Sequence, residues 1–583
     1  MADGKLVAAG KPFAFTGMNF TDFMLGMSIR RDLNRESVAA AVARIKEWKV
    51  RMVRIPLNLG LIQPAEGVFP GNPRWEEIYK RHKLKTDFFR NLEYFISLAG
   101  DHGIYSVLEI HGVPKDPYRY FLGGTPADRA ASKPGKAIAW LYSEGDKPTT
   151  FIDMRNPREC RALEETFRFL ARHFRGDSNI LGFEVPYNEP HDAYMSIPAN
   201  YNRITGRIIR LIQAEDPDRL TFSMPPAWGH DNATWPATFL PPEGLSGGGP
   251  HFYVGNGPVP LRADSKQSRE PWLCRDVELT FDYALPAVLF PYSGIGYPVF
   301  NGEGGEHGHR SFLPRLTPEE AASLMIEANL VQCYAAGLCG AVQWTMWSEK
   351  VFRQFEKVYA EQYSRFGDIY AAGPVDWSRA EAAIIQNPAA VPINNGYNFS
   401  CIPFVRLMLD LHLGGRLRYL TDDQIIHSGL TNVSAGLEQV SDAAMDSCYK
   451  ALIVDRRNLD SRVEQALKKI KTPVLWVDDA SRLTAEEFAA FLRENAIPVD
   501  TKSPADIQIV EGPEHLILYR RRGESSAATV YPLLQRKGIF SLAGEDGATV
   551  FTGDAEKLHN VGFKADVPKW RSRIYRIAAT DPE

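Results

Sequence analysis

Short β-rich runs alternate with amphipathic segments from Phe13 to about Trp347, and this alternation predicts a parallel α/β architecture. The segment Pro157–Arg175 repeats its apolar residues at spacings of three and four, which predicts a helix with one buried face. Another helix is expected to begin after Thr317, because Glu320 stands where it completes a capping box. Eight strands are expected, at Phe15–Asn19, Met52–Leu57, Tyr105–Ile110, Ile180–Val185, Leu220–Ser223, Pro250–Val254, Pro298–Asn301 and Gly340–Trp344. Eight strand and helix units in series predict a closed (β/α)8 TIM barrel.

The pattern changes twice beyond the barrel. Strands of the buried parallel type, such as Ala451–Asp455 and Pro473–Asp478, are separated by helices, one of which opens with a capping box at Thr484. Later runs alternate apolar and polar residues with the period of two that is typical of antiparallel sheets. The fold class is therefore α/β, with three expected domains: the barrel over 1–385, a small α/β domain over 386–504 and a small antiparallel β domain over 505–583.

Charge and cysteine usage narrow the class of protein. The chain has 583 residues and a net charge of −4, and we find no basic patch in it, so no nucleic-acid partner is expected. The six cysteines are scattered without a CxxC pair or ligand spacing, which predicts free thiols.

Two segments of the sequence indicate whether the chain is secreted or spans a membrane. The N-terminal residues lack the apolar stretch of a secretory signal, so cytoplasmic residence is expected, although a mature secreted chain would look the same. The long apolar segment Ala321–Trp344 is interrupted by Glu327, Asn329 and Gln332. This interruption predicts a buried helix followed by a strand, and no membrane span is expected.

Two acidic motifs carry the candidate chemistry. Tyr187-Asn188-Glu189-Pro190 and Asn301-Gly302-Glu303-Gly304-Gly305 each follow a short apolar run. Because catalytic groups of a barrel gather where its parallel strands end, we expect both carboxylates to lie in one shared mouth. Cleaving a glycosidic bond requires one carboxylic acid that protonates the leaving oxygen and one carboxylate that meets the oxocarbenium-like carbon. Glu189 and Glu303 fit these two tasks.

Further polar and aromatic residues fall at or near the ends of expected strands. Each one alone could have a plain structural role, as a barrel salt bridge, a satisfied polar group or a core aromatic. Together they favour a substrate site, because chance would have to direct all of them toward one rim. They are Arg54 on the second strand, His111 after the third, His251 and Tyr253 on the sixth, Trp344 ending the eighth and Trp347 just beyond it.

No metal and no cofactor are expected. Glu306, His307 and His309 resemble metal ligands, but no further ligand spacing accompanies them. The α/β domain lacks a glycine-rich phosphate loop, and Gly302-x-Gly304 would set a charged carboxylate against a pyrophosphate.

A family resemblance rests on these residues. Arg54, His111, Asn188-Glu189, His251-x-Tyr253, Glu303 and Trp344 together resemble glycoside hydrolase family 5, one of the clan A barrels, and the resemblance extends to about Pro374. It implies a retaining mechanism in which Glu189 is the acid/base and Glu303 the nucleophile. The two carboxylates of a retaining pair lie roughly 5–5.5 Å apart, so repulsion keeps one protonated while the other is ionised.

The remaining candidates then take substrate-binding roles. Arg54 and Tyr253 are expected to keep Glu303 charged and oriented, and Asn188 to bond the sugar 2-OH. Trp344 would form a flat apolar floor, with the two candidate histidines as donors at the rim.

The domain arrangement is similar to that of family 42 β-galactosidases and of bacterial family 5 β-mannosidases. This similarity implies an exo-acting enzyme and a homo-oligomer, a trimer by analogy. The leading hypothesis is an exo-β-mannosidase acting on short oligosaccharides such as Man-β-1,4-GlcNAc or mannobiose. The alternatives are a β-glucosidase, an endo-β-glucanase or mannanase and, outside the enzymes, a carbohydrate-binding pseudo-enzyme.

Overall fold

The chain is represented by a computed structural model that describes most of the barrel and of the two following domains. The described residues are 5–8, 10–20, 34–57, 88–110, 154–155, 157–187, 195, 198–223, 242–251, 281–282, 285–294, 297–304, 313, 316–343, 349–387, 402–422, 425, 449–457 and 459–580.

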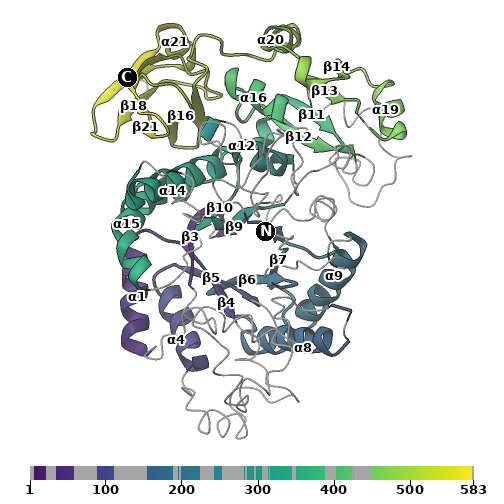
Figure 1. Ribbon diagram of the computed structural model, residues 1–583, viewed down its shortest axis with the longest axis vertical. Coiled ribbons are helices and arrows are strands. Elements are labelled where there is room, and N and C mark those ends of the chain that lie inside the picture. The colour runs from purple at the N-terminus through teal and green to yellow at the C-terminus, as the bar shows by residue number, and fades with distance from the viewer. Residues whose placement is uncertain are drawn as a thin grey trace, which may run out of the picture.

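Eight parallel strands form the barrel in the order β8-β7-β6-β5-β4-β3-β10-β9 (Figure 1). Bridges from Gly248 to Val299 and from His251 to Glu303 join the two ends of this order, so the sheet closes on itself. The predicted barrel is confirmed. Its strands are β3 Phe15–Asn19, β4 Met52–Leu57, β5 Tyr105–Ile110, β6 Ile180–Val185, β7 Leu220–Ser223, β8 Gly247–Gly248, β9 Phe300–Gly304 and β10 Gly340–Gln343.

The sixth and seventh strands differ from their predicted positions. The prediction Pro250–Val254 was wrong at its start, because β8 consists of Gly247 and Gly248 and no side-chain alternation marks it. The seventh strand extends through Gly304, so Glu303 lies within β9 and not beyond it. Glycines are depleted in strands, which is why the sequence pattern ended too early.

Helices surround the barrel, and their ends follow local sequence. Thr317 accepts a hydrogen bond from the backbone of Glu320, whose side chain accepts one in return, as the capping box predicted. The helices are α1 Arg35–Glu47, α4 Phe88–Gly100, α8 Pro157–His173, α9 Pro198–Glu215, α12 Leu285–Leu289, α14 Pro318–Ala335 and α15 Glu349–Ala371.

The amino-terminal end of the barrel interior is apolar. The ring of Phe300 contacts those of Phe15 and Phe222, with centroids 5.6 and 5.3 Å away, respectively. Met52, Val107 and Val342 belong to the same buried cluster. Polar side chains are therefore concentrated farther along the strands, toward their carboxyl ends.

The α/β domain contains a parallel sheet in the order β12-β11-β13-β14. Two of its strands, β11 Ala382–Gln386 and β12 Leu417–Thr421, were not among the predicted elements. The sheet thus begins at Ala382, just ahead of the boundary expected at residue 386. Its other elements are β13 Ala451–Asp455, β14 Val474–Val477, α16 Ile402–Asp410, α19 Ser461–Leu467 and α20 Ala485–Glu494.

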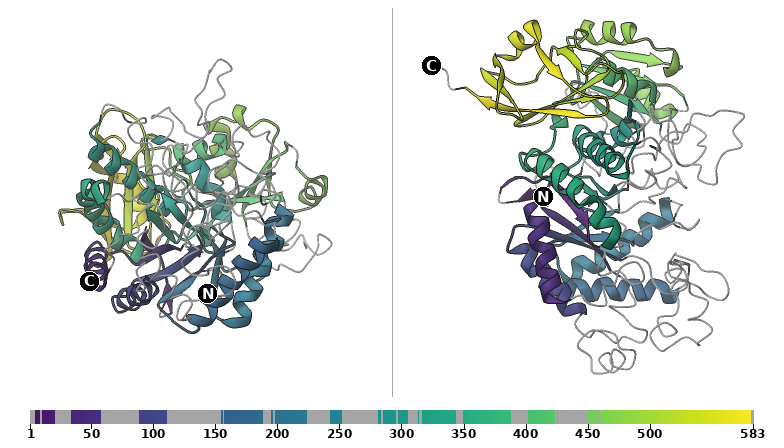
Figure 2. Two further views of the ribbon diagram at one scale, coloured as in Figure 1. Left: turned by 60° about the horizontal axis from the view of Figure 1, so that its bottom comes forward. Right: turned by 60° about the vertical axis from the view of Figure 1, so that its left-hand side comes forward.

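The β domain consists of a five-stranded antiparallel sheet in the order β15-β16-β21-β18-β19 and the pair β17-β20. Figures 1 and 2 show this domain and the α/β domain at one end of the molecule, beyond α12 and α14. Its elements are β15 Ile507–Glu511, β16 His515–Arg520, β17 Ala527–Val530, β18 Phe540–Gly544, β19 Thr549–Gly553, α21 Ala555–Val561, β20 Phe563–Asp566 and β21 Ser572–Ala579.

Candidate active site

A single arginine lies at the centre of the polar part of the barrel. Arg54 of β4 is fully buried and donates to three carboxylates that come from three other strands. Its guanidinium nitrogens lie 2.6 Å from Glu109 Oε2, 2.5 Å from Glu184 Oε2 and 2.7 Å from Glu303 Oε1. All three carboxylates are buried as well. Arg54 thus ties β5, β6 and β9 to β4 through charge-assisted hydrogen bonds.

Two further residues fix this arrangement. Asn19 accepts a hydrogen bond from Arg54 at 2.8 Å and donates to the backbone carbonyls of Gly302 and Gln343. On the other side of Glu303, His251 Nδ1 lies 3.0 Å from Oε2. Both carboxylate oxygens of Glu303 therefore have a nitrogen neighbour within 3.0 Å, and the hydrogen bond from Arg54 fixes the orientation of this side chain.

Among the described residues, the charges at this centre do not balance, because three carboxylates surround one guanidinium. Burial opposes the charge on Arg54, but Glu109, Glu184 and Glu303 outweigh it and raise the pKa of Arg54. Burial raises the pKa of Glu184 to about 7, assisted by the nearby charge of Glu109 and opposed by Arg54. Glu184 Oε1 is buried without a hydrogen-bond partner among the described residues. The centre therefore keeps one carboxyl group poised between its protonated and ionised forms near neutral pH.

A β-bulge directs Glu303 into the barrel. Strands β9 and β10 pair Asn301 with Ala341 and then Gly304 with Gln343, so that two residues of β9 stand opposite Val342 alone. In a regular strand Asn301 and Glu303 would point to the same face. Here Asn301 bonds to Asn329 on the surrounding helix α14, whereas Glu303 reaches Arg54 inside. The bulge re-aims one side chain, a common function of bulges beside active sites.

The structure brings together three of the residues proposed from the sequence, namely Arg54, His251 and Glu303. The others lie outside the described residues, although several follow directly on described strand ends: β5 ends just before His111 and β10 just before Trp344. The proposed site residues outside the described part are His111, Asn188, Glu189, Tyr253, Trp344 and Trp347.

Sequence reasoning missed Asn19, Glu109 and Glu184. Each acid is the single charged residue of an otherwise apolar strand: Glu109 in Tyr105–Ile110 and Glu184 in Ile180–Val185. Acidic residues are almost never fully buried unless they are paired. A lone acid in a strand covered on both faces was therefore a usable sign of a buried ion cluster.

Within the described ranges, no group of three or more His, Cys, Asp and Glu is arranged to hold a metal ion. Cys160, Cys333 and Cys339 are free thiols. In the same part of the chain, no helix is both long and apolar enough to cross a bilayer.

Solved structures share this fold over nearly the whole chain. An exo-β-1,4-mannosidase from Opitutaceae bacterium strain TAV5 matches with a TM-score of 0.52 at 13% identity, covering 94% of this chain and 86% of that one. A cold-adapted β-galactosidase from Rahnella sp. R3 matches with a TM-score of 0.60 at 10% identity, covering 99% of this chain and 100% of that one.

The sequence comparisons define the class. A β-xylosidase from Phanerodontia chrysosporium is 30% identical over 170 residues, which is 29% of this chain and only 28% of that protein's length. The profile described as Cellulase (glycosyl hydrolase family 5) matches residues 6–350, more than half of the chain. A closed barrel with this match defines a glycoside hydrolase. The chain belongs to glycosyl hydrolase family 5, as its resemblance indicated.

Proposed function

We propose that this protein is a retaining exo-β-mannosidase that removes mannosyl units from the non-reducing end of short oligosaccharides. Glu303 is the proposed nucleophile and Glu189 the proposed acid/base. The observation that carries the proposal is the way in which Glu303 is held, with Oε1 on Arg54 and Oε2 beside His251, in a chain of family 5. The contact with Arg54 places a positive charge beside the carboxylate and aims it, as attack on an anomeric carbon requires.

The charge cluster also suits both halves of a double displacement. In the first half, Glu303 bonds to the anomeric carbon while Glu189 protonates the leaving oxygen, and Glu303 loses its negative charge. Arg54 still keeps Glu109 and Glu184 as partners at that stage, so the guanidinium is not left buried without a counter-charge. In the second half, Glu189 acts as the base toward water, and Glu303 regains its charge beside Arg54 as the sugar departs.

The mannosidase proposal is supported by family membership together with the architecture. The exo-β-1,4-mannosidase from Opitutaceae bacterium shares the fold across the barrel and both following domains. The β-galactosidase and the β-xylosidase found in the comparisons act on other sugars, as their names state. The test must therefore determine which sugar the reactive subsite accepts.

The test is a set of initial rates on matched aryl β-mannoside, β-glucoside, β-galactoside and β-xyloside. Glu303→Ala and Glu189→Ala are assayed beside the parent protein, with Glu556→Ala, an exposed acid of α21, as the matched control. We expect the mannoside to dominate, Glu303→Ala to be inactive and Glu556→Ala to equal the parent.

Azide separates the two proposed roles. With Glu303→Ala it should replace the nucleophile and give a glycosyl azide of inverted configuration, whereas with Glu189→Ala it should replace water and give the retained product.

A dominant glucoside rate in the substrate comparison would favour the alternative β-glucosidase. Turnover only on longer chains would favour an endo-glucanase or mannanase. Binding without any turnover in the parent protein would favour the pseudo-enzyme.

A homo-oligomer, with a trimer as the leading case, is part of the same proposal and rests on the domain arrangement alone. Light scattering at assay concentration measures the assembly mass, and a monomer would remove this part of the proposal without affecting the rest.

A further inference from the structure

Beyond its first turn, helix α14 is buried on every side, unlike a helix that covers a barrel and faces solvent. All residues from Ala321 to Tyr334 are buried. Such a helix lies between two packed layers. One side of α14 faces β9 and β10 of the barrel, and another faces α15 and the C-terminal β domain.

On the barrel side, Asn329 holds the bulge that carries Glu303. Its Oδ1 accepts a hydrogen bond from Asn301 Nδ2 at 3.0 Å and one from Cys333 Sγ at 3.0 Å. A Cβ placed on Gly304 would overlap the Asn329 amide, so that amide also fills the space beside Gly304. Asn301 and Gly304 are the residues on either side of the bulge. Asn329 thus contacts both ends of the two-residue segment that aims Glu303 at Arg54.

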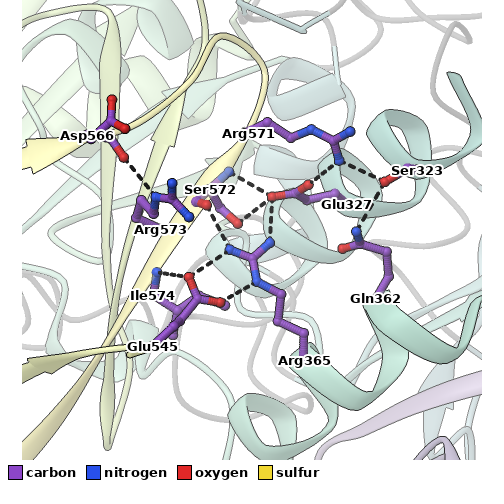
Figure 3. Close-up of polar contacts among 10 residues, drawn as sticks. All are labelled: Ser323, Glu327, Gln362, Arg365, Glu545, Asp566, Arg571, Ser572, Arg573 and Ile574. Carbon is purple, nitrogen blue, oxygen red and sulfur yellow. Dashed lines mark hydrogen bonds and ion pairs between the residues drawn. The ribbon is translucent and has the colours of Figure 1, made fainter. Parts of the chain in front are cut away.

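On the opposite side, two positions earlier, Glu327 joins α14 to the β domain (Figure 3). Its carboxylate accepts hydrogen bonds from Arg571 Nη1 at 2.8 Å and from the backbone nitrogen and hydroxyl of Ser572 at 2.7 and 2.6 Å. Arg365 of α15 donates at 2.8 Å and also pairs with Glu545 of the β domain.

Glu327 is charge-balanced, in contrast to the centre of the barrel. Burial alone would raise its pKa, but Arg365, Arg571 and Ser572 reverse this effect and lower it. A fully hydrogen-bonded buried carboxylate of this kind fixes geometry, because a shift of the helix would leave charges buried without partners.

We propose that Asn329 is a positioning residue for Glu303, and that the C-terminal β domain, through Glu327, holds α14 in the position that Asn329 needs. The inference rests on the proposed role of Glu303. It gives the β domain a function in catalysis although it supplies no group to the described part of the site. Residues two apart on a helix point to nearly opposite sides, so one helix can contact both layers at once.

The first test is Asn329→Ala, compared with Gln362→Ala. Gln362 is a buried amide of α15 that donates to Ser323 of α14 at 3.2 Å. We expect Asn329→Ala to lower kcat by about 10- to 100-fold with KM changed less than about threefold, because it loosens the aim of the nucleophile without touching the sugar. The acid limb of its kcat/KM profile should move to higher pH, since Glu303 would lie less firmly against Arg54. Gln362→Ala should keep the parent kcat and profile.

A second variant keeps the test decisive if Asn329→Ala does not fold. Gly304→Ala adds a Cβ where the Asn329 amide lies, so it should show the same fall in kcat. The double variant should be no slower than Asn329→Ala alone, because removing the amide makes room for the new methyl group. Parent-like kcat in a folded Asn329→Ala or Gly304→Ala protein would overturn the inference.

The role of the β domain is tested by Arg571→Met against Arg573→Met. Arg571 directly precedes β21 and Arg573 is its second residue, but Arg573 is exposed and donates within its own domain to the Asp566 carbonyl. We expect Arg571→Met to lower kcat about 2- to 10-fold, and this effect to vanish in the Asn329→Ala background. Equal rates for the two arginine variants would remove the β domain from the inference.

Glu303→Ala is assayed in parallel, because it distinguishes a failure of the proposed role of Glu303 from a failure of the positioning inference. If Glu303→Ala retains the parent rate, the proposed function of Glu303 fails. If it is inactive while Asn329→Ala is unaffected, only the positioning inference fails.

Discussion

Two buried ion clusters in the described part of the chain have opposite designs, one around Arg54 in the barrel and one around Glu327 between the barrel and the β domain. The first surrounds one cation with three carboxylates, and the second surrounds one carboxylate with two arginines and a serine. The first raises the pKa of Glu184 to about 7, whereas the second lowers the pKa of Glu327.

The Arg54 cluster can therefore exchange a proton near neutral pH, whereas the Glu327 cluster only joins α14 to the β domain. Within the described part of the chain, Glu184 Oε1 in the Arg54 cluster is buried without a hydrogen-bond partner, whereas Glu327 accepts from several donors. Perturbed carboxyl groups tend to occur at functional sites, and balanced ones are typical of structural pairs. Substitutions that change one charge at a time test this distinction between the two clusters.

The largest effect is expected from Arg54→Met. Three buried carboxylates would lose their shared cation, which should abolish measurable turnover and cost about 3–5 kcal/mol of stability. The matched control is Arg219→Met, which replaces a buried arginine that directly precedes β7 and donates to the carbonyls of Phe174 and Ile180. It should lower the thermal midpoint but leave kcat/KM near the parent value, because it lies at the structural end of the barrel.

The same change from Glu to Gln should have opposite signs in the two clusters at pH 8. Glu327→Gln removes the balancing charge from Arg365 and Arg571 and should destabilise by about 3 kcal/mol. Glu184→Gln removes a surplus charge while its amide oxygen can still accept from Arg54, so it should raise the thermal midpoint. Shifts of equal sign in the two variants would contradict the distinction between the clusters.

Glu184 should also give stability a pH dependence that its glutamine variant lacks. A carboxyl whose pKa is raised by folding favours the folded state below its unfolded pKa, and this contribution is lost as pH rises through about 7. The difference between parent and Glu184→Gln, on the order of 3 kcal/mol, should therefore develop between about pH 5 and 8. Thermal midpoints across this range, measured in one buffer series, provide the check, and parallel curves would refute it.

The smallest effect is expected at an exposed pair. Arg482 and Asp479 lie 3.2 Å apart with their side chains largely in solvent. Arg482→Ala should leave both activity and the thermal midpoint unchanged, because water and salt screen such pairs. It serves as the baseline for the buried variants.

Local sequence was enough to predict elements whose ends are determined by neighbouring residues. The capping boxes at Thr317 and Thr484 mark the starts of α14 and α20. Strands β8 and β9 were misplaced because glycines carry no alternation. The barrel as a whole could still be predicted, because the fold follows from eight successive strand and helix units even when two of the strands are misplaced.

The site could be predicted only in part, for a related reason. Arg54, His251 and Glu303 were recognisable as a set, whereas Glu109 and Glu184 acquire meaning only when β5 and β6 lie beside β4. The bulge and its contact with Asn329 depend on two elements packing together, which no local pattern encodes. The roles proposed for the six residues outside the described part stay predictions.

The place of β21 in its sheet has a consequence for biosynthesis. Among the described strands it is the last in chain order, yet it lies in the middle of the sheet, between β16 and β18. Ser572, its first residue, follows Glu327 by 245 residues. At about 5–20 residues per second, a ribosome needs roughly 12–50 s to cover this distance. A newly made barrel therefore waits that long before Glu327 meets Arg571 and Ser572, and during this time α14 lacks the layer that the β domain places over it.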